Sequence, residues 1–290
     1  MNRIIGLILF FSLIHTLHAQ KELDQAFLKC QYRYVQSWDT IDFKRSTEDL
    51  IILRIGSNIS KSCSYYTEEF DTKLENTHSA LKYRQSMNTA VTNAAITGKL
   101  DVQGLGIRKS TEYIYKNYPQ GKMTVTDRII SDVFIYEDEL NTQNWQLEDS
   151  TKTVMNYNCI KASCHFRGRE WVAWFAPDIP ISNGPWKLGG LPGLIMEAYD
   201  YRHENHFLIT GLEKVDDEPI LFTRGFSIRS VLIPFQKVER KNFLKTNIGY
   251  HRDPVGYLYK QITPHPSDKS ARPKEKHIIR YDLLETDYND

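Results

Sequence analysis

The sequence predicts a mainly β protein of the α+β class, in which one core-packed helix lies against a curled antiparallel sheet. Short segments that alternate apolar and polar residues recur between turn-forming residues, a pattern typical of many short strands. The chain also contains 17 Tyr, 13 Phe and 5 Trp, which pack well on pleated surfaces. Only one long stretch has a helical period. Such a sheet forms a half-barrel around its helix or closes into a barrel.

The chain begins with the three parts of a secretory signal peptide. Arg3 supplies a positive charge, residues 4–14 are mostly apolar, and a more polar stretch ends at the small residue Ala19. A membrane-spanning helix needs about 20 apolar residues, more than this run offers. We therefore expect residues 1–19 to be removed before Gln20. The mature protein is then exported, to the periplasm or the medium, and has no transmembrane segment.

Composition bounds the domain organisation and the class of partner. Lys and Arg number 37 against 36 Asp and Glu, and the two signs are interspersed. Nucleic acid requires a focused positive surface, so this balance argues against it. We expect one β-rich domain over residues 20–260. Residues 261–290 are charged and contain Pro, a composition that buries too little apolar surface to order itself, so we expect a mobile tail.

Period-two patterns place the strands, and one period change places the helix. In the first half, strands are expected at residues 28–38, 50–55, 63–66, 113–115 and 123–126, the last two joined by a turn at Pro119-Gln120-Gly121. In the second half they are expected at residues 132–136, 145–147, 154–157, 160–175, 194–199, 207–212 and 221–229, with a short helix near 234–244.

Residues 79–99 carry the strongest helical pattern. One face of this helix collects Ala80, Tyr83, Met87, Ala90, Val91 and Ala94, and Gly98 is placed to end it. A stripe of Ala and Met favours packing on a sheet over a cofactor groove, so this is the helix expected to cover the core.

Four cysteines, Cys30, Cys63, Cys159 and Cys164, are all candidates for disulfides in an exported chain. Four cysteines allow three pairings. Cys159 and Cys164 are five apart, which puts them on opposite faces of a straight strand, so elimination favours Cys30 with Cys63 as a first bridge. A metal site is the alternative interpretation, but the cysteines lack the C-x-x-C or paired Cys and His spacing of a zinc site.

Residues 179–200, IPISNGPWKLGGLPGLIMEAYD, concentrate glycine and proline in a chain otherwise sparse in both. Pro192-Gly193 suits a type II turn, in which the glycine adopts a positive φ. Gly189-Gly190 allows the backbone to pass close to a bulky group. The segment is therefore interpreted as a rigid loop that leads into the strand at 194–199.

Residues 190–195, GLPGLI, match the hexapeptide that names the GLPGLI family of exported bacterial proteins. Residues 168–175 (GREWVAWF), Gly184-Pro185-Trp186-Lys187 and Leu53-Arg54-Ile55-Gly56 are also similar to that family. The resemblance implies an exported, β-rich protein of Gram-negative bacteria that acts alongside outer-membrane transport systems. It implies no activity and no catalytic residue.

Two interpretations of the loop remain, a structural corner or the wall of a binding cleft. In the second, the candidate ligand-binding residues are Trp171, Trp174, Trp186, Gly190, Pro192 and Gly193. We predict no set of catalytic residues, and we expect no cofactor or metal. His203 and His206 are three residues apart, whereas the zinc-binding motif H-E-x-x-H places its histidines four apart. We expect a non-enzymatic carrier of an apolar small molecule. The alternatives are a factor that docks on an outer-membrane protein and, third, an unrecognised hydrolase.

Overall fold

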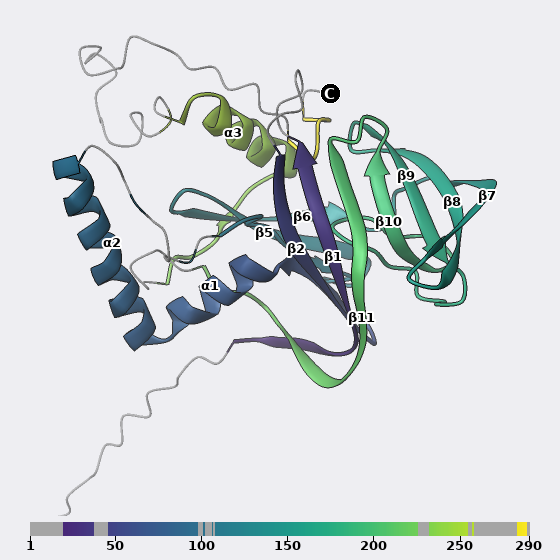
Figure 1. The fold of residues 1–290 in the computed structure, drawn as a ribbon, viewed down its shortest axis with the longest axis horizontal. Helices are drawn as coiled ribbons and strands as arrows, with labels where there is room; N and C mark the ends of the chain where they lie inside the picture. The colour runs from purple at the N-terminus through teal and green to yellow at the C-terminus, as the bar shows by residue number, and fades with distance from the viewer. Residues whose placement is uncertain are drawn as a thin grey trace, which may run out of the picture.

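The computed structural model describes residues 20–37, 46–97, 101, 106, 108–225, 232–254, 257 and 283–288. The expected signal peptide, residues 1–19, lies outside the described residues. Twelve strands form one sheet that curls without closing, in the order β12-β6-β5-β4-β3-β2-β1-β11-β10-β9-β8-β7 (Figure 1). All neighbours pair antiparallel except β12 and β6. The predicted β-rich α+β class with a curled antiparallel sheet is confirmed.

Most strands lie where they are expected, but the expected strand at 154–157 contains the β7–β8 turn, and Tyr65 and Tyr66 of the expected strand at 63–66 begin α1 (Tyr65–Glu75). Their bounds are β1 Glu22–Ser37, β2 Ser46–Gly56, β3 Ser60–Ser64, β4 Tyr113–Lys116, β5 Lys122–Ile129, β6 Asp132–Glu139, β7 Gln146–Val154, β8 Tyr157–Phe166, β9 Arg169–Ala176, β10 Leu194–Asp200, β11 Asn205–Leu221 and β12 Gln236–Lys237. The two longest, β1 and β11, pair along most of their length at the centre of the sheet. The inward residues of the curl form the main core, which includes Tyr32, Leu53, Ile195 and Phe207.

The expected single strand over residues 160–175 is instead the hairpin of β8 and β9. Arg167 and Gly168 form its two-residue turn, with φ of 54° and 79°. Two successive positive φ values are what a tight hairpin turn requires, since they match the twist of the flanking strands. Arg-Gly lacks the Asn or Asp that usually marks such a turn, so the sequence hides it.

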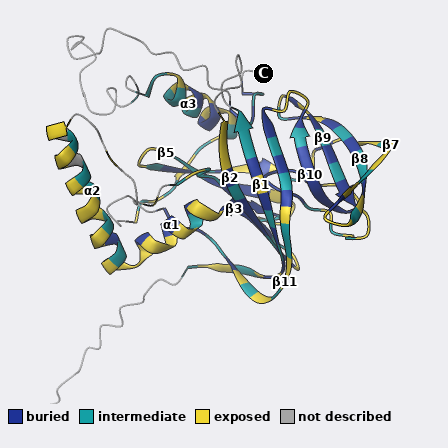
Figure 2. Ribbon diagram, viewed as in Figure 1, coloured by how far each residue is buried: buried dark blue, intermediate teal, exposed yellow. Residues whose placement is uncertain are grey.

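Three helices lie in the described part of the chain: α1 Tyr65–Glu75, α2 Thr77–Thr97 and α3 Arg240–Arg252. The helix predicted at 79–99 is α2, but its expected packing on the sheet is wrong. Its Ala80 and Tyr83 contact Phe70 and Leu74 of α1, and most of its other residues are exposed (Figure 2). The small side chains of the stripe bury little apolar area, and α1 lies between α2 and the sheet. None of the described helices has both the length and the apolarity of a membrane-spanning helix.

The sheet is covered by α1 and α3 rather than by α2. In α3, Phe243, Leu244 and Ile248 are buried, and the ring of Phe243 lies 5.5 Å from those of Phe134 and Tyr136 in β6. The apolar face of α3 therefore packs against one half of the curled sheet, and the same helix lines a pocket.

The end of the chain belongs to the core. Leu283, Glu285 and Tyr288 are buried, and the segment they belong to, Leu283–Tyr288, lies beside α3 (yellow in Figure 1). The expected mobile tail over residues 261–290 is therefore wrong for these residues, and residues 261–282 lie outside the described part. The charged composition predicted that this segment would be solvated. It could not show that four cationic side chains contact residues 283–288, namely Arg167, Arg169, Lys187 and Arg240.

The four cysteines are buried and free, so no disulfide joins them. The favoured pair is excluded by the register. Cys30 pairs with Leu53, and Leu53 pairs with Ser62, so these three share one face of the sheet. Cys63 follows Ser62 and points to the other face. Burial raises the pKa values of Cys30 and Cys63 to about 12, so both stay as thiols.

Candidate functional site

A pocket of about 750 Å³ lies between the sheet, α3 and the C-terminal segment. It is lined by Tyr34, Gln36, Thr47, Glu48, Asp49, Arg108, Lys109, Ser110, Thr111, Glu112, Asp127, Arg128, Ile130, Tyr136, Phe243, Leu244, Asn247, Tyr250, His251, Leu283, Leu284 and Glu285. This volume is in the range of small-molecule sites. A second hollow of about 450 Å³ along Glu22–Phe27 has fewer lining groups and none with a strongly raised pKa.

The walls of the pocket differ in chemistry. One wall is apolar: α3 contributes Phe243, Leu244 and Tyr250, and the C-terminal segment contributes Leu283 and Leu284. The polar part of the lining comes mainly from the segment before β4, from β2 and from β5. A ligand that fills the pocket therefore meets both hydrocarbon and hydrogen-bonding groups.

Two carboxylic acids face each other on the polar wall. Tyr113 of β4 pairs with Thr126 of β5, so the register places Glu112 opposite Asp127. The Thr111 hydroxyl donates to Asp127 Oδ1 at 2.6 Å, and the backbone N–H of Arg128 donates to the same oxygen at 2.7 Å. Among the described residues, no group donates a hydrogen bond to the Glu112 carboxylate or forms an ion pair with it. Its partly exposed side chain faces the pocket that it lines.

Both acids hold their protons more tightly than usual. The pKa of Glu112 is raised to about 8, mainly by burial and also by the Asp127 charge, with Lys187 acting in the opposite direction. The pKa of Asp127 is raised to about 6 by burial, although the hydrogen bonds from Thr111 and Arg128 act to lower it. At neutral pH, one acid of the pair is therefore mostly neutral and the other mostly charged.

The other acids of the pocket have partners. Asp49 Oδ1 accepts from the Ser64 hydroxyl at 2.8 Å, and Asp49 Oδ2 accepts from the backbone N–H of Ser110 at 2.9 Å. Glu48 pairs with Arg33 at 2.7 Å. Glu285 pairs with Lys187 and Arg240. Asp127 resembles Asp49 in accepting from one hydroxyl and one backbone N–H, and among the described acids of the pocket Glu112 alone has no such partner.

This difference predicts that Glu112→Gln stabilises the protein at alkaline pH. A carboxyl whose folded pKa of about 8 exceeds its ordinary value of 4.5 lowers the stability of the fold, and this cost grows as pH rises between those two values. We expect no effect at pH 4 and a gain of at least about 1.4 kcal/mol at pH 8, the equivalent of one pKa unit. Urea midpoints at the two pH values measure it. Glu139→Gln, at an exposed residue of β6, is the matched control. An equal gain at pH 4 and pH 8 would contradict the assignment.

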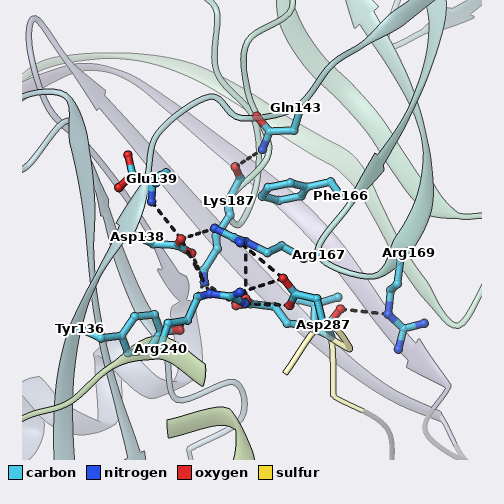
Figure 3. A network of polar contacts seen from close by, with 12 residues as sticks. Tyr136, Asp138, Glu139, Gln143, Phe166, Arg167, Arg169, Lys187, Arg240 and Asp287 are labelled. Atoms are coloured by element: carbon cyan, nitrogen blue, oxygen red, sulfur yellow. Dashed lines mark hydrogen bonds and ion pairs between the residues drawn. The ribbon is translucent and has the colours of Figure 1, made fainter. Parts of the chain in front are cut away.

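A network of buried ions includes the pocket residue Glu285; Figure 3 shows its other members, Asp138, Lys187, Arg240 and Asp287, close together. Lys187, whose side chain is 0% exposed, contacts Asp138 Oδ2 at 2.8 Å and the carboxylate of Glu285. Arg240 contacts Glu285 at 2.5 Å and Asp287 at 2.8 Å. Burial lowers the pKa of Lys187, but Glu285 and Asp138 more than offset this, so the pKa is raised. The lysine is therefore charged and ties the loop to the C-terminal segment.

Two further arginines hold the same segment. Arg169 donates to the backbone carbonyls of Leu284 at 2.9 Å and Leu283 at 2.7 Å, and it pairs with Asp200 and Glu204. Arg167 pairs with Asp138 and contacts Asp287 at 3.5 Å. The part of the pocket wall formed by Leu283 and Leu284 is thus positioned by cations from β9, the β8–β9 turn, the loop and α3.

The tryptophans predicted to bind a ligand lie elsewhere. Trp171 and Trp186 are 0% and 2% exposed, with ring centroids 5.5 Å apart in the main core. Trp174 is three residues from Trp171 in β9, and Lys152 Nζ lies 4.4 Å from the centroid of its ring. None of the three lines the pocket. The binding role expected for them stays a prediction, and what the structure shows is that Trp171 and Trp186 fill the core.

The glycines and the proline of the motif also serve the fold. Gly190 has a φ of 85°, whereas Gly193 does not have the positive φ that the expected type II turn needs. A Cβ at Gly193 would lie 2.3 Å from the carbonyl oxygen of Ala176, so close approach requires this glycine. Neither Gly190, Pro192 nor Gly193 lines the pocket.

A buried lysine holds the loop before the motif. Lys116 Nζ donates to Asn183 Oδ1 at 3.0 Å and to the carbonyl oxygens of Gly184 at 2.8 Å and Leu188 at 2.5 Å. The loop held in this way carries Lys187, which pairs with the pocket residue Glu285. The motif therefore contributes to the pocket indirectly, through Lys187.

Sequence reasoning missed Glu112 and Asp127. The sequence feature that could have revealed them was the hairpin centred on Pro119-Gln120-Gly121. Its register sets the two acids opposite each other, one position beyond the pair of Tyr113 with Thr126. Like charges in that arrangement are destabilising and therefore need an explanation.

Comparisons with known proteins give little beyond these observations. No curated protein matches the chain. Solved structures that match part of the chain include two of PNGF-II. "Structure of PNGF-II in P21 space group" has 13% identity and a TM-score of 0.45, and covers 76% of this chain and 32% of that one. "Structure of PNGF-II in C2 space group" has 13% identity and a TM-score of 0.43, and covers 73% and 30%. The chain spans about a third of those proteins.

One family model matches part of the chain. The matched residues run from the end of β8 through β9 and the Gly- and Pro-rich loop into β10, the part that contains the tryptophans, Lys187 and the GLPGLI hexapeptide. The chain is thus similar, over residues 166–197, to the family described as "Protein of unknown function (Porph_ging)".

Proposed function

We propose that this chain is an exported carrier protein of the GLPGLI family that holds a small amphipathic molecule in the pocket beneath α3. Export is supported by the charged, apolar and polar parts of residues 1–19, and the family by residues 190–195. By that resemblance, the carrier serves an outer-membrane transport system. The observation that supports binding is the pocket of about 750 Å³ with one apolar and one polar wall.

A substitution that fills the pocket tests the proposal. Asn247 lies on the face of α3 that lines the pocket and is partly buried, whereas Lys245 on the same helix is exposed. We expect Nile red, a neutral dye that fluoresces in apolar surroundings, to bind the wild-type protein. Asn247→Trp should weaken this binding at least tenfold, because the indole occupies the space, and Lys245→Trp should leave it unchanged.

The two variants carry the same new side chain on the same helix, so a general effect of tryptophan is controlled. Absence of dye binding to the folded wild-type protein, or equal binding by the two variants, would overturn the proposed binding site. Mass spectrometry of molecules that co-purify with wild-type protein and with the Asn247→Trp variant then identifies the natural ligand.

One observation favours a second candidate, an exported hydrolase. Glu112 and Asp127 have pKa values of about 8 and about 6, a separation that suits a general acid and a general base. If the co-purified molecule is recovered intact from the Glu112→Gln variant but chemically altered from the wild type, catalysis is the function. If it is intact in both, binding is.

A further inference from the structure

The charge balance inside the pocket points to the kind of ligand. Of its five acids, Glu48, Asp49 and Glu285 are engaged by Arg33, by hydroxyl and amide donors, and by Lys187 with Arg240. Asp127 accepts two hydrogen bonds on Oδ1, from the Thr111 hydroxyl and the backbone N–H of Arg128, and has no ion pair among the described residues. Glu112 has neither an ion pair nor a hydrogen bond from the described residues. These two acids lie opposite each other and within reach of one ligand group.

The cations of the same wall are directed elsewhere. Arg108 Nε donates to Asp71 Oδ1 at 2.7 Å. Lys109 Nζ donates to the backbone carbonyl of Glu48 at 2.6 Å and lies 4.0 Å from the centroid of the Tyr66 ring. The unbalanced charge at the centre of the polar wall is therefore negative.

Arg128 follows Asp127 in β5, and the alternation of a strand directs their side chains to opposite faces. After burial, the charged groups that act most on Arg128 are Arg108 and Asp71, which belong to the side facing α1. Arg128 therefore acts mainly on that side, and its charge lowers the pKa of Asp127 only as a minor contribution after the two hydrogen bonds that Asp127 accepts.

The rest of the pocket suits hydrocarbon and aromatic groups. Phe243, Leu244 and Leu283 line the same pocket as the two acids, and Tyr136 and Tyr250 also line it. Aromatic rings attract cations as well as apolar chains, because their faces are negative. A ligand with a positive head and an apolar body matches both walls at once.

We propose that the pocket binds a primary amine with an apolar tail, its ammonium group held between Glu112 and Asp127 and its tail against α3 and the C-terminal segment. An ammonium group has three N–H donors, which two carboxylates can accept together. A metal ion is a poorer match, since no group of three or more His, Cys, Asp or Glu in the described ranges is placed to bind one. This inference rests on the proposed binding function of the pocket.

Binding is expected to depend on pH. The groups that act on Glu112 from the surrounding elements are Asp49 of β2, Asp127 of β5, Lys187 of the loop and Glu285 of the C-terminal segment; Tyr136 and His251 also line the space. With its pKa of about 8, Glu112 in the empty pocket is mostly neutral at pH 7, so binding of an ammonium ion drives release of its proton. The amine stays charged below its pKa of about 10.4. Its affinity should therefore rise from pH 6 to pH 9.

The experiment measures displacement of Nile red by octylamine, octan-1-ol and octanoate, three ligands with the same tail and different heads. We expect octylamine to displace the dye from wild-type protein at a concentration at least tenfold below that of either other ligand, and at pH 9 better than at pH 6. Glu112→Gln should remove this preference while the dye still binds. Glu139→Gln, which removes the same charge from an exposed site, should keep it.

The outcomes separate the two proposals. Equal displacement by all three ligands, or a preference that survives in a Glu112→Gln, Asp127→Asn double variant, overturns the amine assignment and leaves the binding function intact. Failure of the dye to bind any form of the protein counts against the binding function itself. Displacement by Mg²⁺ or Ca²⁺ alone, in the absence of an amine, would replace the amine with a metal ion.

Discussion

Lys187→Met is expected to destabilise the protein by about 3–5 kcal/mol, the usual cost of breaking a buried ion pair by removal of one partner. The ammonium group of Lys187 lies between Asp138 and Glu285, and all three side chains are almost completely buried. Methionine fills a similar volume without a charge, so packing changes little. The two carboxylates that remain keep Arg167 and Arg240 but lose their central cation.

Urea unfolding at pH 7 measures this effect, with Lys122→Met as the control. Lys122 forms an exposed ion pair with Glu137 at 3.2 Å, and pairs of that kind contribute at most about 1 kcal/mol. Addition of Glu285→Gln to Lys187→Met should recover part of the loss, because one uncompensated charge is removed. Equal midpoints for the two lysine variants would show that the buried network contributes no more than a surface pair.

Gly193→Val is expected to cost about 3 kcal/mol, at the upper end of the range for overpacking. The Cβ position at Gly193 is 2.3 Å from the carbonyl oxygen of Ala176, a backbone atom that cannot rotate away. Ala176 pairs with Leu194, so a shift there disturbs the first pair between β9 and β10. Core residues Leu194, Ile195 and Met196 follow directly.

Gly121→Val is the comparison for this variant. Gly121 has a φ of 81° but no atom within 4 Å of its Cβ position, so valine there meets only the conformational cost of about 1–2 kcal/mol. The difference between the two urea midpoints isolates the close contact. If Gly193→Val unfolds no earlier than Gly121→Val, close approach to Ala176 is not why the chain has glycine there.

The fold could be predicted from the sequence where the local pattern of apolar residues agrees with the burial that the whole sheet imposes. The alternation at residues 50–55 and the hairpin at 113–126 are strands because one face of each meets the core. The turn at Arg167-Gly168 escaped prediction because only backbone φ values identify it. The packing of α2 escaped it because an apolar stripe shows which face is buried and not what it is buried against.

Most of the candidate site could not be predicted from the sequence. Tryptophan and glycine attract notice in a sequence, yet Trp171 and Trp186 fill the core and Gly193 allows a close contact. Glu112 and Asp127 are ordinary residues until the hairpin register sets them opposite each other and burial raises their pKa values. Both effects depend on the rest of the chain, including α3 and the C-terminal segment.

The contribution of Leu283, Leu284 and Glu285 to the pocket has a consequence for the effect of truncation. All twelve described strands of the sheet precede these three residues in the sequence, so the strands alone do not make the complete pocket. Removing residues 283–290 takes away part of the wall and also the carboxylate that pairs with Lys187 and Arg240. Such a truncation should therefore lower the urea midpoint and ligand binding together.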